Sequence, residues 1–154
     1  MRRIKYDLSG RYVAEVKRLW RSEEDMTRNP VVIESGYGDI EIKPICYEGH
    51  GCQGGIVVRD KKGEKLVEAE LKGGKITWFL GDVVEENDIP TFIEWANFVL
   101  KVTSIIKPVV DLLPVENYMA HKWKVEITLY NRHYSIPEYA RGKPEYTLTL
   151  ELPE

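Results

Sequence analysis

Two cysteines and a histidine stand close together in the segment CYEGHGCQGG, residues 46–55. Cys46, His50 and Cys52 could supply three ligands to zinc, which is held by four in structural sites. A fourth ligand would have to be one of three other side chains: Glu48, His121 or His133. The same spacing also suits a disulfide that closes a short loop, or two buried free thiols at a turn. The sequence leaves three alternatives open: a metal site, a disulfide and two free thiols. The metal site would require zinc as its cofactor.

A second pattern, an acidic residue, one spacer and a lysine, occurs at Glu70 and Lys72 on a predicted strand that follows a hairpin. This pattern resembles the core of the PD-(D/E)xK nuclease superfamily. The resemblance implies that carboxylates hold a divalent metal and that the lysine activates the attacking water. The aspartate that the family places on the preceding strand is replaced here by residues 53–55, Gln-Gly-Gly. Because Glu41 and Lys43 repeat the pattern, it also fits the solvated face of a charged strand.

Tyrosines and arginines alternate in a third stretch, between the last two predicted strands. Aromatic rings can stack on bases while cations meet phosphates, so this composition suits single-stranded nucleic acid or a protein partner. The candidate contact residues are Tyr130, Arg132, Tyr134, Tyr139 and Arg141. The alternative is a long loop whose tyrosines lie over the sheet.

The elements that must position these residues are mostly strands. Alternation of apolar and charged residues predicts strands over 30–34, 39–47, 54–60, 64–71, 121–130 and 145–152, and residues 71–80 are predicted to form a turn followed by a further strand. A long, buried helix is predicted over about 90–107, and residues 9–25 favour a shorter N-terminal helix, although a strand alternation also fits them. The predicted fold class is therefore α+β, with about seven mostly antiparallel strands packed on one long helix.

The long helix carries apolar residues on two stripes, where a helix that packs on one sheet needs only one. Thr91 and Glu94 form a predicted capping box at its start, and Pro108 is expected to kink or end it. The second stripe consists of Phe98, Val102 and Ile105. Either the apolar residues 109–113 fold back over it, or a second subunit covers it, and we favour a homodimer.

The composition bounds the function. A length of 154 residues fits one domain, 1–154, and a net charge of −3 gives no overall attraction to nucleic acid or to anionic membranes. The chain has neither a signal peptide pattern nor an uncharged apolar span, so we expect a cytoplasmic protein that does not enter the membrane. Abundant Glu and Lys with a single Gln are typical of thermophiles.

The phosphate loop, the Rossmann glycine pattern and the common hydrolase motifs are absent from the sequence. We therefore expect a small intracellular binding module, non-enzymatic and self-associating, with a homo-oligomer or a protein partner. The alternatives are a divalent-metal nuclease-like protein that uses Glu70 and Lys72, and a zinc-stabilised module that binds nucleic acid.

Overall fold

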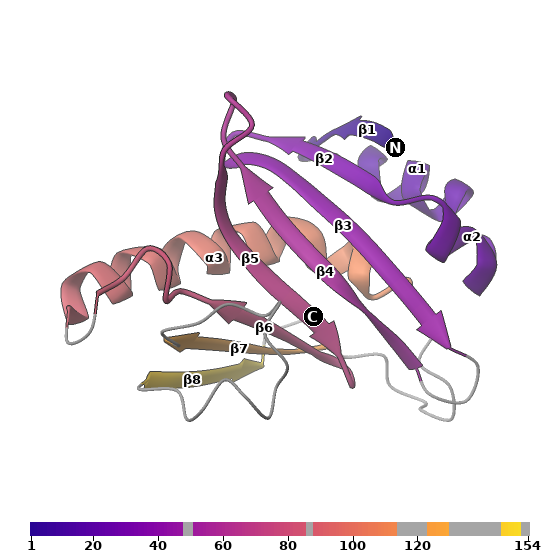
Figure 1. Ribbon diagram of the computed structural model, residues 1–154. Coiled ribbons are helices and arrows are strands. Elements are labelled where there is room, and N and C mark those ends of the chain that lie inside the picture. The colour runs from indigo at the N-terminus through magenta and orange to yellow at the C-terminus, as the bar shows by residue number, and fades with distance from the viewer. Residues whose placement is uncertain (48–50, 86–87, 114–122, 130–145, 152–154) are drawn as a thin grey trace.

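The computed structural model describes residues 1–47, 51–85, 88–113, 123–129 and 146–151. These residues form one eight-stranded sheet in the order β1 to β8, accompanied by three helices (Figure 1). This arrangement confirms the predicted α+β class. The strands are β1 (Arg2–Lys5), β2 (Val31–Ser35), β3 (Gly38–Tyr47), β4 (Gly51–Arg59), β5 (Lys65–Lys72), β6 (Lys75–Phe79), β7 (Lys124–Leu129) and β8 (Tyr146–Glu151). The helices are α1 (Arg11–Leu19), α2 (Glu23–Arg28) and α3 (Ile89–Val110).

The sheet is mixed. The pairings from β2 to β6 and between β7 and β8 are antiparallel, whereas β1 with β2 and β6 with β7 are parallel. Parallel neighbours need a crossover connection, usually a helix. Accordingly, α1 and α2 connect β1 to β2, and α3 lies in the connection from β6 to β7.

The first 28 residues hold more structure than the sequence predicted. The expected N-terminal helix is present as α1, but β1 precedes it and a separate helix, α2, follows it. Ser22 caps α2, since its hydroxyl accepts a hydrogen bond of 3.1 Å from the backbone N–H of Asp25.

The ends of α3 differ from the predicted ones. Asp88, not Thr91, is the N-cap, because its carboxylate accepts hydrogen bonds from both the backbone N–H and the hydroxyl of Thr91. The capping box predicted at Thr91 is therefore wrong. Pro108 does not end the helix, which continues to Val110.

All three helices cover one face of the sheet (Figure 1). Two buried hydrogen bonds tie this layer together. The hydroxyl of Tyr12 in α1 donates to the backbone carbonyl of Ile105 in α3 at 2.8 Å, and the indole N–H of Trp78 in β6 donates to the hydroxyl of Thr103 in α3 at 2.9 Å. The opposite face of the sheet carries the charged residues, and we call it the outer face.

In the described part of the chain, α3 is the one helix long and apolar enough to cross a membrane. The core helix of a globular domain satisfies the same criteria, so this observation by itself is weak evidence for a membrane protein. Here Val99, Val102 and Ile106 are fully buried against the rest of the chain.

Candidate functional site

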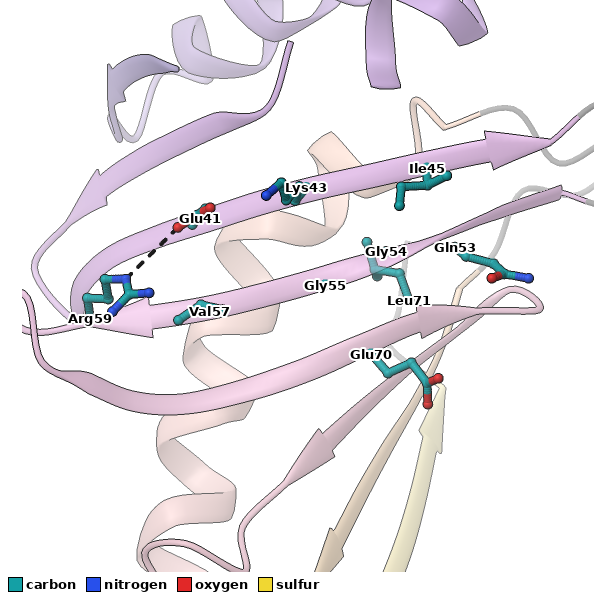
Figure 2. Close-up of a pocket in the computed structure, with 10 residues that line it drawn as sticks. All are labelled: Glu41, Lys43, Ile45, Gln53, Gly54, Gly55, Val57, Arg59, Glu70 and Leu71. Carbon is teal, nitrogen blue, oxygen red and sulfur yellow. Dashed lines mark ion pairs between the residues drawn. The ribbon is translucent and has the colours of Figure 1, made fainter. Parts of the chain in front are cut away.

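A groove of about 390 Å³ runs along the outer face over β3, β4 and β5 (Figure 2). Its volume falls within the range of small-molecule sites, about 300–1,000 Å³. The residues that line it come from all three strands: Glu41, Lys43, Ile45, Gln53, Gly54, Gly55, Val57, Arg59, Glu70 and Leu71.

The groove exists because β4 lacks side chains at its middle. Gly55 is paired with Lys43 on one side and with Glu70 on the other, so the outer face is hollow between these two side chains. The neighbouring Gly54 has φ of +153°, which side-chain-bearing residues rarely adopt. A Cβ atom on Gly54 would collide with the backbone carbonyl oxygen of Lys43. Hence β3 and β4 approach closely at this point because Gly54 is a glycine.

The groove has an uneven charge. The guanidinium of Arg59 lies 3.9 Å from the carboxylate of Glu41, an ion pair drawn in Figure 2. Lys43 is exposed, and within the described ranges it has neither an ion-pair nor a hydrogen-bond partner. The carboxylate of Glu70 points away from β3 and β4 in Figure 2. Lys43 therefore gives the groove an ammonium group without a partner in the described ranges, next to the ion pair of Glu41 and Arg59.

Apolar side chains lie at both ends of the groove. Ile45 is 43% exposed and stands across from Gln53, while Val57 stands beside Arg59 at the other end. The site thus offers a cation at its centre, an amide at one end and two aliphatic contacts. This combination suits the binding of a molecule with an anionic group and an apolar part.

The two acid-x-lysine patterns lie on the same face but not as a metal site. Glu70 and Lys72 are on β5, and Glu41 and Lys43 are on β3, two strand spacings or about 10 Å away. The cross-strand neighbours of Glu70 are Gly55 and Thr77, neither of which is a carboxylate. Among the described residues, no group of three or more His, Cys, Asp and Glu side chains could hold a metal ion.

Cys46 and Cys52 form a disulfide. They are direct partners in the register of β3 and β4, which brings their Cα atoms to 3.9 Å. Of the three alternatives that the sequence left open, the structure therefore has the disulfide, and in this state neither sulfur is a thiolate that could bind zinc. His50 and Glu48, the other candidates in this loop, lie outside the described residues.

Two of the three residues of the predicted dimer stripe on α3 are buried, and the third is partly buried. Val102 is 0% exposed and Ile105 is 3% exposed within the single chain, and Phe98 is partly buried against Tyr37 and Trp95. The physical reason is that α3 has two partners in its own chain: the sheet covers one stripe, and α1 packs beside Ile105. Val102 and Ile105 are therefore core residues of the single chain and do not form a surface for a second copy, whereas an interface at Phe98 stays a prediction.

The tyrosine-rich stretch with Tyr130, Arg132, Tyr134, Tyr139 and Arg141 lies outside the described residues, as do His121 and His133.

The sequence patterns did not predict the groove. Its signal was the pair Gly54–Gly55 inside an otherwise apolar strand, since a glycine within a strand often marks a close backbone approach or a ligand site. Comparisons with family models, with curated proteins and with solved structures found no match to this chain.

Proposed function

We propose that this protein is a binding module and that the outer-face groove is its ligand site. The ligand class that fits is a small organic anion with an apolar part. The observation that carries the proposal is the exposed ammonium of Lys43, unpartnered in the described structure, on the residue of β3 that is paired with Gly55 of the groove floor. Small-molecule sites use a few polar groups to orient the ligand, and here Lys43 and Gln53 could do so beside the apolar side chains of Ile45 and Val57.

The volume sets the size of the ligand. A volume of about 390 Å³, near the lower end of the ~300–1,000 Å³ range of small-molecule sites, suits a ligand of roughly a dozen non-hydrogen atoms. Its carboxylate or phosphate would accept a charge-assisted hydrogen bond from Lys43, and its apolar part would contact Ile45 or Val57. With about 0.3 kcal/mol for each atom, such a ligand would bind with a Kd near the millimolar range.

Decanoate, which has a carboxylate and a single alkyl chain, is a suitable probe. Titration of the labelled protein, followed by amide chemical shifts, should perturb β3 and β4 around Lys43 and Gly55. Lys43→Met removes the charge but keeps the chain length, and it should weaken binding about tenfold. Lys61→Met is the matched control, because Lys61 is an exposed lysine in the turn between β4 and β5, outside the groove.

A second variant tests the shape of the groove. Gly55→Val fills the floor and suits a strand, so the variant should fold normally and lose decanoate binding. Decanol, which lacks the charge, should bind more weakly than decanoate to the wild type. Equal affinity of the wild type, Lys43→Met and Gly55→Val for decanoate would show that the groove is not the ligand site.

A second candidate function, self-association, rests on the first turns of α3. Ile89 and Ile93 are 51% and 52% exposed, and Phe92 and Trp95 beside them are only partly buried. Exposed apolar clusters on proteins often mark interaction surfaces. We propose this end of α3 as the contact between two copies. Sedimentation equilibrium should then show a dimer in the wild type and a folded monomer in Ile93→Glu, whereas a monomeric wild type at high concentration would exclude this candidate.

A further inference from the structure

The disulfide lies at the end of the β3–β4 hairpin. The same end of the hairpin forms one end of the groove. The pair next to Cys46 and Cys52 along the ladder is Ile45 with Gln53, and both of these residues line the groove. The two sulfurs belong to the helix-covered face, the same face as Ile42, because side chains alternate along a strand. The disulfide therefore acts on the groove through the backbone, from the opposite side of the sheet.

Among the described residues, this end of the hairpin pairs with no third strand, so its support comes from the core in which Cys52 is buried. β2 pairs with β3 only as far as Ile42, and β5 pairs with β4 only from Gln53 onward. In the register of the described strands, Cys46 and Cys52 are paired with each other and with no third strand. Figure 1 shows this end of β3 and β4 projecting past β2 and β5. An overhanging two-stranded ribbon is marginally stable by itself.

The sequence of β4 weakens this ribbon further. Gly51, Gly54 and Gly55 are within five residues of one another, and two of them have positive φ, +75° at Gly51 and +153° at Gly54. Glycine loses more conformational entropy on folding than other residues and has no side chain to pack. A covalent link between Cys46 and Cys52 compensates for this loss because it holds the two strands together.

We propose that the disulfide is a redox switch for the groove. When it is oxidised, Ile45 and Gln53 are held beside the glycine floor and the groove is preformed. When it is reduced, the overhanging end of the hairpin opens more often and the groove loses that end. The regulation of ligand binding by this disulfide rests on the proposed function, whereas the opening of the hairpin can be measured without any ligand.

The reductant is a dithiol. One of its thiolates attacks the sulfur of Cys46, which is the more exposed of the two, since Cys52 is only 2% exposed. A mixed disulfide forms with Cys46, and Cys52 leaves as a thiolate that takes up a proton. The second thiol of the reductant then attacks its own mixed disulfide and releases Cys46. Two electrons pass to the protein, and the reductant becomes a cyclic disulfide.

Amide hydrogen exchange is the primary test. In an antiparallel ladder, hydrogen-bonded and non-hydrogen-bonded pairs alternate, and the close Cα approach of Cys46 and Cys52 marks them as non-hydrogen-bonded. The amides of Ile45 and Gln53 are then in a hydrogen-bonded pair and report its opening. Dithiothreitol should raise their exchange rates about tenfold. The amides of Ile33 and Ile40, which the same alternation makes a hydrogen-bonded pair of β2 and β3, lie far along β3 from the disulfide; they serve as the internal control and should change less than twofold.

The variant Cys46→Ser/Cys52→Ser is the matched control for the reductant. It should exchange at Ile45 and Gln53 as fast as the reduced wild type, and dithiothreitol should not change it further. Decanoate should bind the oxidised protein at least about fivefold more tightly than the reduced protein or this variant.

Three results would overturn the inference: two free thiols in protein prepared without reductant, exchange at Ile45 and Gln53 that dithiothreitol does not change, or faster exchange with unchanged decanoate affinity. If decanoate binds neither redox state, the proposed ligand class is wrong, and the exchange rates alone then decide whether the disulfide controls the hairpin.

Discussion

Replacing Gly54 with alanine should destabilise the protein far more than the same change at Gly55. The two glycines are adjacent on β4, but of the two only Gly54 has a positive φ, +153°, and a Cβ added to Gly54 would meet backbone atoms of β3. That Cβ would overlap the carbonyl oxygen of Lys43 and lie 2.9 Å from the Cα of Pro44. Because both contacts are to backbone atoms, neither can be relieved by rotation of a side chain, so β3 and β4 must separate.

The expected loss of stability follows from the unfavourable backbone conformation of alanine at this position and from the separation of the two strands. A residue held in a rarely populated backbone region costs about 1–3 kcal/mol, and the separation of the strands adds to this. We expect the free energy of unfolding to fall by about 3 kcal/mol, a large share of the 5–15 kcal/mol typical of single domains. For a chain of this length, the melting temperature should fall by about 6–12 °C.

Urea denaturation followed by circular dichroism measures both variants. Gly55→Ala should lie within about 1 kcal/mol of the wild type, because its side chain would face the open groove and alanine suits a strand no worse than glycine does. If Gly54→Ala is as stable as the wild type, or if the two variants lose equal stability, the close approach of β3 and β4 is not as described.

Three further changes test the core. Val102→Glu should unfold the protein and not yield a folded monomer, since an unpaired buried carboxylate costs at least about 4 kcal/mol; a soluble, folded Val102→Glu monomer would restore the dimer stripe. Thr103→Val should lower stability by about 1–3 kcal/mol in urea denaturation, because it leaves the indole N–H of Trp78 buried without its acceptor, and unchanged stability would exclude that hydrogen bond. Burial, which disfavours the phenolate, raises the pKa of Tyr12 to about 12 from the ordinary 10.0. The folded state then holds the phenolic proton of Tyr12 more tightly than the unfolded state does. The contribution of Tyr12 to the stability of the fold is therefore complete below pH 10 and is lost as the pH rises toward 12. Tyr12→Phe should remove this part of the pH dependence, as measured by thermal unfolding at several alkaline pH values.

Strand by strand, the sequence anticipated much of the sheet. Alternation such as that of Val67, Ala69 and Leu71 with Glu68 and Glu70 specifies a strand with one buried and one charged face, and the structure has β5 there. The periodicity works because side chains point to opposite faces in turn. It could not reveal the parallel pairings, since these depend on the path of the connecting helices and not on local pattern.

The candidate sites depended more strongly on long-range contacts. The spacing of Cys46 and Cys52 was compatible with a metal, a disulfide or free thiols, and only the register of β3 and β4 placed the two sulfurs together. Likewise, Lys43, Gly55 and Glu70 are far apart in the chain, and the groove exists only when three strands align them.

The sequence by itself determined which residues are buried, whereas the tertiary structure decided what buries them. The two apolar stripes of α3 predicted a helix covered on more than one side, and Val102 and Ile105 are indeed in the core. Their covering element, however, is in the same chain: Tyr12 of α1, 93 residues away, donates its hydrogen bond to Ile105. Hydrophobic periodicity records the amount of apolar surface that must leave water, and a helix from the same chain or from a second copy satisfies that requirement equally well.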